Sequence, residues 1–204
     1  MSRAREPKPY AESCDQNRDP ILAVIREVYT RPGMLLEIGS GTGQHAVYFA
    51  RHLPHVQWQP ADVAENLPGI TAWVEEAELL NVRTPLELDV TMGRWPVARV
   101  DAVFSANTVH IMSWPEVQAM FKGLARVMNN DAPFCLYGPF NYHGRYTSES
   151  NARFDGWLRA RDPNSGIRDV DDLHDLAQAV RLEPEDDRAM PADNRTLVWR
   201  RRAG

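Results

Sequence analysis

Hydrophobic and polar positions alternate along this chain in blocks that predict strands and helices by turns. Short continuous apolar runs predict five strands, at residues 35–38, 56–61, 86–88, 100–105 and 134–137. Between them, apolar residues recur every three or four positions and predict helices over roughly 44–53, 66–80 and 113–127. Strands that alternate with helices predict a doubly wound α/β fold around a parallel sheet, buried on both faces.

The two ends of the chain depart from this rhythm. Asp19 followed by Pro20 predicts the cap and first residue of a helix that continues to Val28. After the fifth strand comes a loop with a polar helix, and then Asp169 begins a last helix. Two strand-like segments, 182–190 and 196–201, close the chain as a terminal hairpin.

This order of elements predicts a single domain over residues 1–204. Within it, we expect residues 1–30 to form an N-terminal cap helix and residues 139–170 to form an insertion that covers a substrate.

The most specific pattern follows the first strand, where Glu37 leads into the turn Gly39-Ser40-Gly41-Thr42-Gly43. Strand, glycine-rich turn and helix form the nucleotide-cradling unit of doubly wound folds, because glycine lets the backbone approach a ligand closely. A dinucleotide site needs a third glycine at position 44, where this chain has Gln44. A carboxylate such as Glu37 suits the cationic methionine part of S-adenosylmethionine (SAM). We interpret the turn as a SAM site, although glycines also serve merely to turn a chain.

Polar side chains end the next three strands as well, at the edge where open α/β sheets bind their ligands. Asp62, with Val63 beside it, is placed to hydrogen-bond ribose hydroxyls in either a SAM site or an NAD site. Asp89, with Val90, suits the adenine amino group of SAM, or else it is a turn or cap residue. Asn107 ends the fourth strand beside the same crevice.

Asn17 and Arg18 precede the helix predicted at Pro20 and are candidates to fold over the carboxylate of the cofactor. Arginine binds a carboxylate through two parallel hydrogen bonds. An exposed arginine at a helix start is equally consistent with this position.

Six segments make nearly the whole chain similar to the methyltransferase-like protein 26 family, long catalogued as a domain of unknown function. They are Asn17-Arg18-Asp19-Pro20-Ile21-Leu22, Glu37-Ile38-Gly39-Ser40-Gly41-Thr42-Gly43-Gln44-His45, Tyr137-Gly138-Pro139-Phe140-Asn141-Tyr142, Ser150-Asn151-x-x-Phe154-Asp155, Asp162-Pro163-x-x-Gly166-Ile167-Arg168-Asp169 and Met190-Pro191-Ala192-x-Asn194. The resemblance implies SAM binding and a class I methyltransferase fold, with a Rossmann-like seven-stranded sheet whose last strand is antiparallel. It implies no particular substrate, and Asp193 departs from the family's usual Asn.

Two residues are candidates for catalysis. His110 lies one turn past the fourth strand, and its imidazole titrates near neutrality, so it is our candidate base for an acceptor that must lose a proton. A histidine packed beneath the following helix explains the position equally well. Tyr142, after the fifth strand, either faces the acceptor or lines a loop.

Composition narrows the partners. A net charge of −5 argues against a dedicated nucleic-acid binder, which would carry a basic stripe. Cys14 and Cys135 make no disulfide framework, and we expect no membrane span because no apolar stretch of about 20 residues is present. We also expect a cytoplasmic protein. His52 and His55 lack further ligands nearby, so no metal is expected.

The sequence therefore predicts a SAM-dependent methyltransferase that acts on a small molecule. One alternative is a SAM-binding protein without transfer activity, serving as a sensor or subunit. A second is an NAD-dependent oxidoreductase, against which Gln44 and the lack of a Tyr-x-x-x-Lys pair both count. The methyl acceptor and the oligomeric state are left open.

Overall fold

The computed structural model describes residues 8–203. Its strands are β1 Gly33–Ile38, β2 Val56–Asp62, β3 Leu86–Glu87, β4 Ala102–Ala106, β5 Pro133–Asn141, β6 Arg168–Asp169, β7 Leu182–Ala189 and β8 Asn194–Arg201. In the described chain their order is β3-β2-β1-β4-β5-β8-β7, with β6 paired to β5 at one side. Only β8 runs antiparallel to its neighbours, β5 and β7. This confirms the predicted Rossmann-like sheet with an antiparallel last strand.

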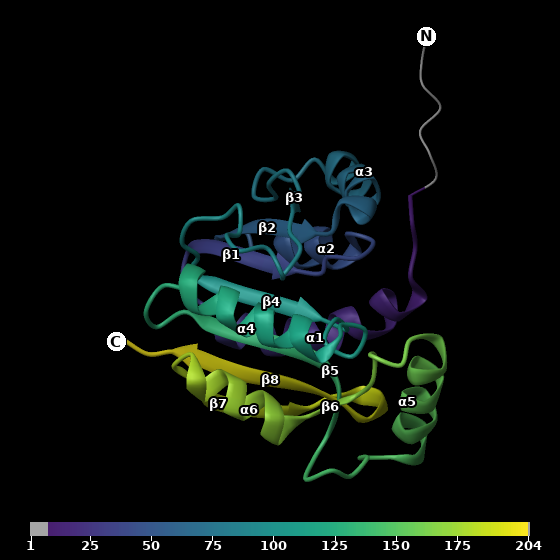
Figure 1. Cartoon of the computed structure of the whole chain (residues 1–204). Helices are drawn as coiled ribbons and strands as arrows, with labels where there is room; N and C mark the ends of the chain where they lie inside the picture. Colours follow the sequence, from purple (N-terminus) through teal and green to yellow (C-terminus); the bar gives the residue numbers. More distant parts are fainter. Residues whose placement is uncertain (1–7, 204) are drawn as a thin grey trace.

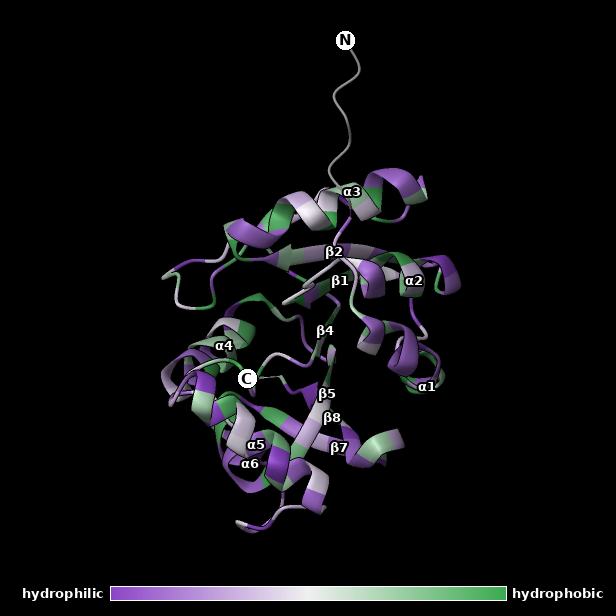
Figure 2. Ribbon diagram, turned by 90° about the vertical axis from the view of Figure 1, so that its right-hand side faces the viewer, coloured by the Kyte–Doolittle hydropathy of each residue, from purple (hydrophilic) through white to green (hydrophobic). Residues whose placement is uncertain are grey.

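Helices cover both faces of the sheet (Figure 1). They are α1 Glu12–Val28, α2 Gln44–His52, α3 Leu67–Ala77, α4 Trp114–Val127, α5 Glu149–Arg161 and α6 Val170–Ala179, with short 3₁₀ turns η1 Ala64–Asn66 and η2 Pro191–Asp193. In Figure 1, α4 and α6 lie in front of the sheet and α1 and α2 behind it. Green and purple segments alternate along the helices in Figure 2, as expected for helices with one face against the sheet.

Alternating side chains of each strand feed two hydrophobic cores, one on each face of the sheet. Leu36 packs with the core beneath α4 and α6, which includes Phe121 and Leu173. Its neighbour Leu35 points the other way and packs with the core beneath α1 and α2, which includes Phe49. The period of two along the strand therefore joins both helical layers to one sheet.

The first helix begins earlier than its sequence predicts. Helix α1 starts at Glu12 and contains Pro20, so Asp19 is not its cap. Proline removes one hydrogen bond from the ladder, but two acidic residues in the first turn and the buried Ile21 and Ile25 stabilise the helix on both sides of it.

Other boundaries differ by a few residues. Strand β5 runs through Pro139, which lies opposite Asn194 of β8, so the insertion leaves the sheet later than expected. Helix α3 ends at Ala77, and Leu80, expected on its buried face, is fully exposed at 100%. The capping box of Ser113 and Glu116 is present, and Asp169 caps α6 through the N–H of Asp171.

Candidate functional site

The glycine turn between β1 and α2 has a backbone that only glycine adopts without strain. Gly39, Gly41 and Gly43 have φ angles of 73°, 58° and 92°. A Cβ at Gly39 would lie 2.3 Å from Cγ2 of Thr108, and one at Gly43 would lie 2.9 Å from Cα of Ile70. A Cβ at Gly41 would meet nothing within 4 Å. The turn is thus packed tightly on both flanks and open at its middle.

A pocket of about 400 Å³ opens above this turn, at the carboxyl ends of β1, β2 and β4. We call it the acidic pocket. It is lined by Ala11, Ser13, Cys14, Ile38, Gly39, Ser40, Gly41, Thr42, His45, Asp62, Val63, Asn66, Leu88, Asp89, Val90, Ala106, Asn107, Thr108, Ile111, Met112 and Glu116. Three of these side chains are carboxylic acids, and among the described residues no lysine or arginine lines the pocket.

The predicted acids at the ends of β2 and β3 both line the acidic pocket. Oδ2 of Asp62 accepts a hydrogen bond of 2.7 Å from the N–H of Gly41, and Oδ1 accepts from the N–H of Val63 at 2.8 Å. Asp89 accepts from the hydroxyl and the N–H of Thr91, and these bonds hold its pKa below the usual range. Asp62 therefore joins the glycine turn to β2, and Asp89 is fixed within its own turn.

Glu37 lies beneath the turn instead of in the acidic pocket. It is 2% exposed, and its Oε2 accepts hydrogen bonds of 2.9 Å from the Ser40 hydroxyl and from Nε1 of Trp58. Burial raises the pKa of Glu37 to about 7, against the opposing effect of those two bonds. Glu37 therefore supports the glycine turn from below through its hydrogen bond with Ser40. Gly43, the cap of α2, likewise does not line the pocket.

The segment before α1 covers the acidic pocket from the outside. The N–H of Ala11 donates to Oε1 of Gln44 at 2.6 Å, and Nε1 of Trp73 donates to the carbonyl of Pro9 at 2.8 Å. These bonds place Ala11, Ser13 and Cys14 along the wall of the pocket. No sequence pattern predicts this wall, because it depends on contacts with α2 and α3.

Arg18 does not face the acidic pocket, contrary to its predicted role. It pairs with Asp15, lies over the ring of Tyr48 with a separation of 4.7 Å, and lines a different hollow. The early start of α1 is the reason, since Arg18 sits inside the helix and is turned toward α2. Asn17 shares a 2.7 Å hydrogen bond with Nε2 of His45 and lines a neighbouring cavity.

That neighbouring cavity, of about 450 Å³, lies between α1, the end of β4, α5 and η2. We call it the amide-lined cavity. It is lined by Ser13, Gln16, Asn17, Asn107, His110, Tyr137, Pro139, Asn151, Phe154, Pro191, Ala192 and Asn194. Ser13 and Asn107 line both cavities, so the two adjoin. Asn107 has a φ of 58°, the left-handed conformation that asparagine tolerates best among non-glycine residues.

His110 lies in the wall of the amide-lined cavity, 5% exposed. Its Nδ1 has no hydrogen-bond partner in residues 8–203, and its ring meets the ring of Phe154 edge-on at 5.3 Å. Burial first, and the charge of Arg168 second, lower the pKa of His110 to about 4. The imidazole is therefore neutral at pH 7, which leaves a lone pair free to accept a hydrogen bond but weakens it as a base.

Tyr142 lies outside both cavities. Its hydroxyl donates to Oδ2 of Asp187 at 2.7 Å, and Arg195 lies beside its ring. Burial, the bond to Asp187 and the charge of that carboxylate all raise the pKa of Tyr142. The prediction that it faces the acceptor is not supported, because the extension of β5 carries Tyr142 past the cavity and onto the β7–β8 hairpin.

Helix α5 is held beside the amide-lined cavity by two charged residues that do not line it. The buried Asp155 accepts from the Tyr146 hydroxyl, from Nε of Arg159 and from the N–H of Ile167, at 2.7, 2.7 and 2.6 Å. Arg168 donates to the carbonyls of Val109 and Met112, in the segment that follows β4. These bonds fix α5, which supplies the cavity with side chains of its own.

The amide-lined cavity also includes Asn151, Phe154 and Asn194, which are not among the predicted site residues although they lie in segments that carry the family resemblance. The acidic pocket likewise includes His45, Ile111 and Glu116, which are not predicted.

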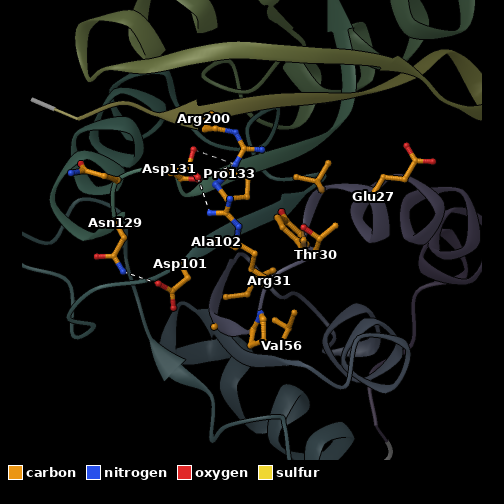
Figure 3. A pocket seen from close by; sticks show the side chains of 16 residues that line it. Glu27, Thr30, Arg31, Val56, Asp101, Ala102, Asn129, Asp131, Pro133 and Arg200 are labelled. Atoms are coloured by element: carbon orange, nitrogen blue, oxygen red, sulfur yellow. Dashed lines mark hydrogen bonds and ion pairs between the residues drawn. The ribbon is translucent and has the colours of Figure 1, made fainter.

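Another hollow, of about 340 Å³, lies at the opposite end of the sheet, where Gly33, Ala102 and Pro133 begin their strands (Figure 3). We call it the amino-end hollow. Its charged side chains all have polar partners, one of which, Arg188 beside Glu27, lies outside the hollow. Arg31 pairs with Asp131 at 2.8 Å, and Nδ2 of Asn129 donates to Asp101 at the same distance.

None of the described helices has the length and apolarity needed to cross a lipid bilayer. Within residues 8–203, no three histidine, cysteine or acidic side chains gather as metal ligands.

Solved structures similar to this chain include methyltransferases. The S-adenosylmethionine-dependent methyltransferase SibL, in its apo form, matches with a TM-score of 0.79 and 19% identity over 94% of this chain and 56% of its own. An O-methyltransferase family protein from Burkholderia thailandensis matches with a TM-score of 0.80 and 15% identity, over 91% of this chain and 56% of its own. PigF with SAH matches at 0.76 and 13% identity, over 89% and 55%. This chain spans little more than half the length of these three proteins, and at such identities the likeness establishes a shared fold.

A family model described as "Protein of unknown function (DUF938)" matches residues 8–201. It covers almost the whole chain. The resemblance to the methyltransferase-like protein 26 family stays a prediction.

Proposed function

Because this chain belongs to the DUF938 family, whose description assigns no activity, we infer its function from the site: SAM-dependent transfer of a methyl group to a small molecule. The observation that carries the proposal is the acidic pocket, with three carboxylic acids and no lysine or arginine among its described lining residues, directly above the glycine turn.

The charge of the acidic pocket distinguishes between SAM and NAD, the two ligands that a fold of this kind can bind. A dinucleotide brings a doubly negative pyrophosphate, which needs basic side chains or a free helix N-terminus. The side chain of Gln44 instead accepts the N–H of Ala11 across the start of α2. SAM brings a sulfonium and an ammonium, which carboxylates stabilise. The residues present fit SAM and disfavour NAD.

In this proposal the acidic pocket holds the cofactor through Asp62, Asp89 and the backbone of the glycine turn. Leu88, Val90 and Met112 supply apolar surface for an adenine ring. SAM, when bound, supplies an electrophilic methyl group on a positively charged sulfur. The chain's own task is then to bring an acceptor into line with that methyl group and to exclude water.

The amide-lined cavity is the proposed place for the acceptor, because it adjoins the acidic pocket at Ser13 and Asn107. His110 lines this cavity as a neutral imidazole and can accept a hydrogen bond from an acceptor hydroxyl or amine. Its lowered pKa favours holding the acceptor over removing a proton before the transfer.

A transfer assay tests this function. The protein is incubated with methyl-labelled SAM and a small-molecule extract, and the demethylated cofactor and labelled products are measured. We expect turnover by the wild type and about tenfold less or none by Asp62→Ala, which removes the carboxylate that fixes Gly41. Binding of SAM without turnover in any extract would favour the alternative, a SAM-binding sensor or subunit. Binding of NAD alone would favour the oxidoreductase.

A further inference from the structure

The walls of the amide-lined cavity carry no formal charge. Each of its lining residues in the described chain is an amide, a hydroxyl, an apolar group or the neutral His110. The adjoining acidic pocket has three carboxylic acids, so the change in charge falls at the shared residues Ser13 and Asn107. The two cavities are therefore suited to different chemistry.

A charged molecule is a poor occupant of such a cavity. A carboxylate or an ammonium group that leaves water loses its hydration, and it recovers that free energy only beside an opposite charge. Three charged residues on or after α5 are already engaged, since Asp155 and Arg159 pair at 2.7 Å and Arg168 is bound to backbone carbonyls. None of these three lines the cavity. An uncharged molecule avoids this cost and can use the amides.

The polar lining is suited to a molecule with several hydrogen-bonding groups. Asn151 donates to the Thr147 hydroxyl at 2.8 Å and to the carbonyl of Asp193 at 3.1 Å. These bonds fix its side-chain orientation in the wall. Asn107, Asn194 and Gln16 add further amides. Fixed amides recognise hydroxyl, amide and ring-nitrogen groups by direction instead of by charge.

The apolar part of the lining is suited to a flat ring. Phe154 stacks on Trp157 at 5.8 Å with an angle of 17° between the rings, and it meets His110 edge-on. Pro139 and Pro191 add rigid apolar surface to the same cavity. Aromatic rings favour stacked or edge-on partners, so these groups favour a planar ligand over a flexible chain.

Two independent observations indicate that this cavity holds a ligand. Nδ1 of His110 is buried without a partner among the described residues, and an unmet buried polar atom is costly. Ala192, which also lines the cavity, and the next residue Asp193 have φ angles of 57° and 55°. Left-handed backbone at two successive residues without a glycine is strained, and strain of this kind gathers at ligand sites.

We propose that the amide-lined cavity takes an uncharged, planar, aromatic or heteroaromatic acceptor that carries hydroxyl or amide groups, and that it rejects carboxylate and ammonium analogues. The description of the ligand as a methyl acceptor rests on the function proposed above. The binding preference itself follows from this cavity alone.

A matched set of ring compounds tests this preference. The probes are 4-hydroxybenzamide, 4-hydroxybenzoate and 4-hydroxybenzylamine, which share a ring and differ in charge near neutral pH. Each is titrated by calorimetry into the full chain, with and without the demethylated cofactor. We expect the neutral amide to bind about tenfold more tightly than either charged probe. Equal or tighter binding of a charged probe would overturn the proposal, as would failure of all three to bind to folded protein.

A pair of identical substitutions keeps the test specific to the cavity. Gln16→Glu adds a negative charge to the wall at an exposed helix position, and Gln178→Glu makes the same change on α6, outside the cavity. We expect Gln16→Glu to raise affinity for the ammonium probe about threefold or more, with no change in Gln178→Glu. Equal effects of the two substitutions would contradict the placement of the site.

Titration of SAM into the same samples separates the two proposals. If the neutral probe binds and SAM does not, the cavity's preference stands and the methyltransferase function fails. If SAM binds and no probe does, the preference fails and the cofactor site stands.

Discussion

The two ends of the central strands each carry hollows of similar size, but the polar groups that line these hollows differ in whether they have partners. At the amino ends, the hollow of about 340 Å³ is lined by charged side chains that all have polar partners, as Arg31 and Arg200 do in Asp131 (Figure 3). At the carboxyl ends, the acidic pocket holds three acids that accept hydrogen bonds but pair with no cation, and the amide-lined cavity holds an unpartnered His110 nitrogen. Left-handed backbone occurs at both ends, at Asn107 and at Asp131.

This difference teaches that volume alone does not mark a site. A hollow whose polar groups are all satisfied gains little from a ligand, because binding must break those bonds first. A hollow that holds an unmet hydrogen bond gains from an occupant that supplies the partner. For this reason we propose that the functional site lies at the carboxyl ends of the strands, where open α/β sheets generally bind their ligands.

The largest expected effect concerns strain at the glycine turn. Gly39→Ala should lower the free energy of unfolding by about 3 kcal/mol, because a Cβ both favours negative φ and would lie 2.3 Å from Thr108. Gly41→Ala should cost about 1 kcal/mol, since its φ is positive but its surroundings are open. Gly93→Ala, in open space, is the matched control. Denaturant unfolding measures all three, and equal losses would show that the turn holds no special strain.

The next effect concerns the buried acid beneath the turn. The pKa of Glu37 is raised from 4.5 to about 7, so the folded protein holds a proton there that the unfolded chain releases. The bound proton stabilises the folded protein fully below about pH 4.5, and this stabilisation is lost as pH rises through 7. The shift from 4.5 to about 7 corresponds to a loss of about 3 kcal/mol in the free energy of unfolding.

Glu37→Gln keeps the acceptor oxygen and cannot ionise, so it should remove this pH dependence. Denaturant unfolding of the wild type and of Glu37→Gln at about pH 5 and pH 8 measures how the free energy of unfolding of each protein changes with pH. The variant should gain stability relative to the wild type at the higher pH. An unchanged difference between the two pH values would mean that Glu37 is already ionised in the folded protein.

A smaller effect tests the boundary of the acceptor region. Tyr142→Phe removes a hydroxyl that donates to Asp187, and should cost about 1 kcal/mol of stability without changing SAM binding or acceptor turnover. Unfolding and the transfer assay measure both. A loss of turnover much larger than the loss of stability would restore Tyr142 to the site, and His110→Ala, inside the cavity, serves as the positive comparison.

The smallest effect belongs to the amino-end hollow. Asp131→Asn removes the negative charge that faces Arg31 and Arg200, and exposed ion pairs of this kind contribute about 0.5 kcal/mol. Asparagine also tolerates the φ of 66° at this position. SAM affinity should not change. A marked change in SAM affinity would break the contrast between the two ends of the sheet.

Sequence patterns predict those parts of this molecule that depend on neighbours along the chain. Apolar runs and the glycine turn predict the sheet and the carboxyl-edge acids Asp62 and Asp89, because period and turn chemistry are local. Arg18 and Tyr142 lie outside the acidic pocket and the amide-lined cavity for the opposite reason. Their directions depend on where α1 begins and how far β5 extends, and both boundaries are set by packing against distant segments.

The amide-lined cavity shows the same limit. Asn17, Asn151 and Asn194 come from three separate segments of the chain and meet only through α1, the insertion and η2. Each lies in a segment quoted for the family resemblance, but no spacing along the sequence brings them together. Their common lack of charge becomes visible only once the cavity is assembled.

The most direct test of the central claim is a calorimetric titration of SAM, its demethylated product and NAD into wild type, Asp62→Ala and Asp131→Ala. The account predicts binding of the first two ligands to the wild type and to Asp131→Ala, an affinity about tenfold or more weaker for Asp62→Ala, and no binding of NAD. Binding of NAD in place of SAM, or equal loss from the two substitutions, would contradict it.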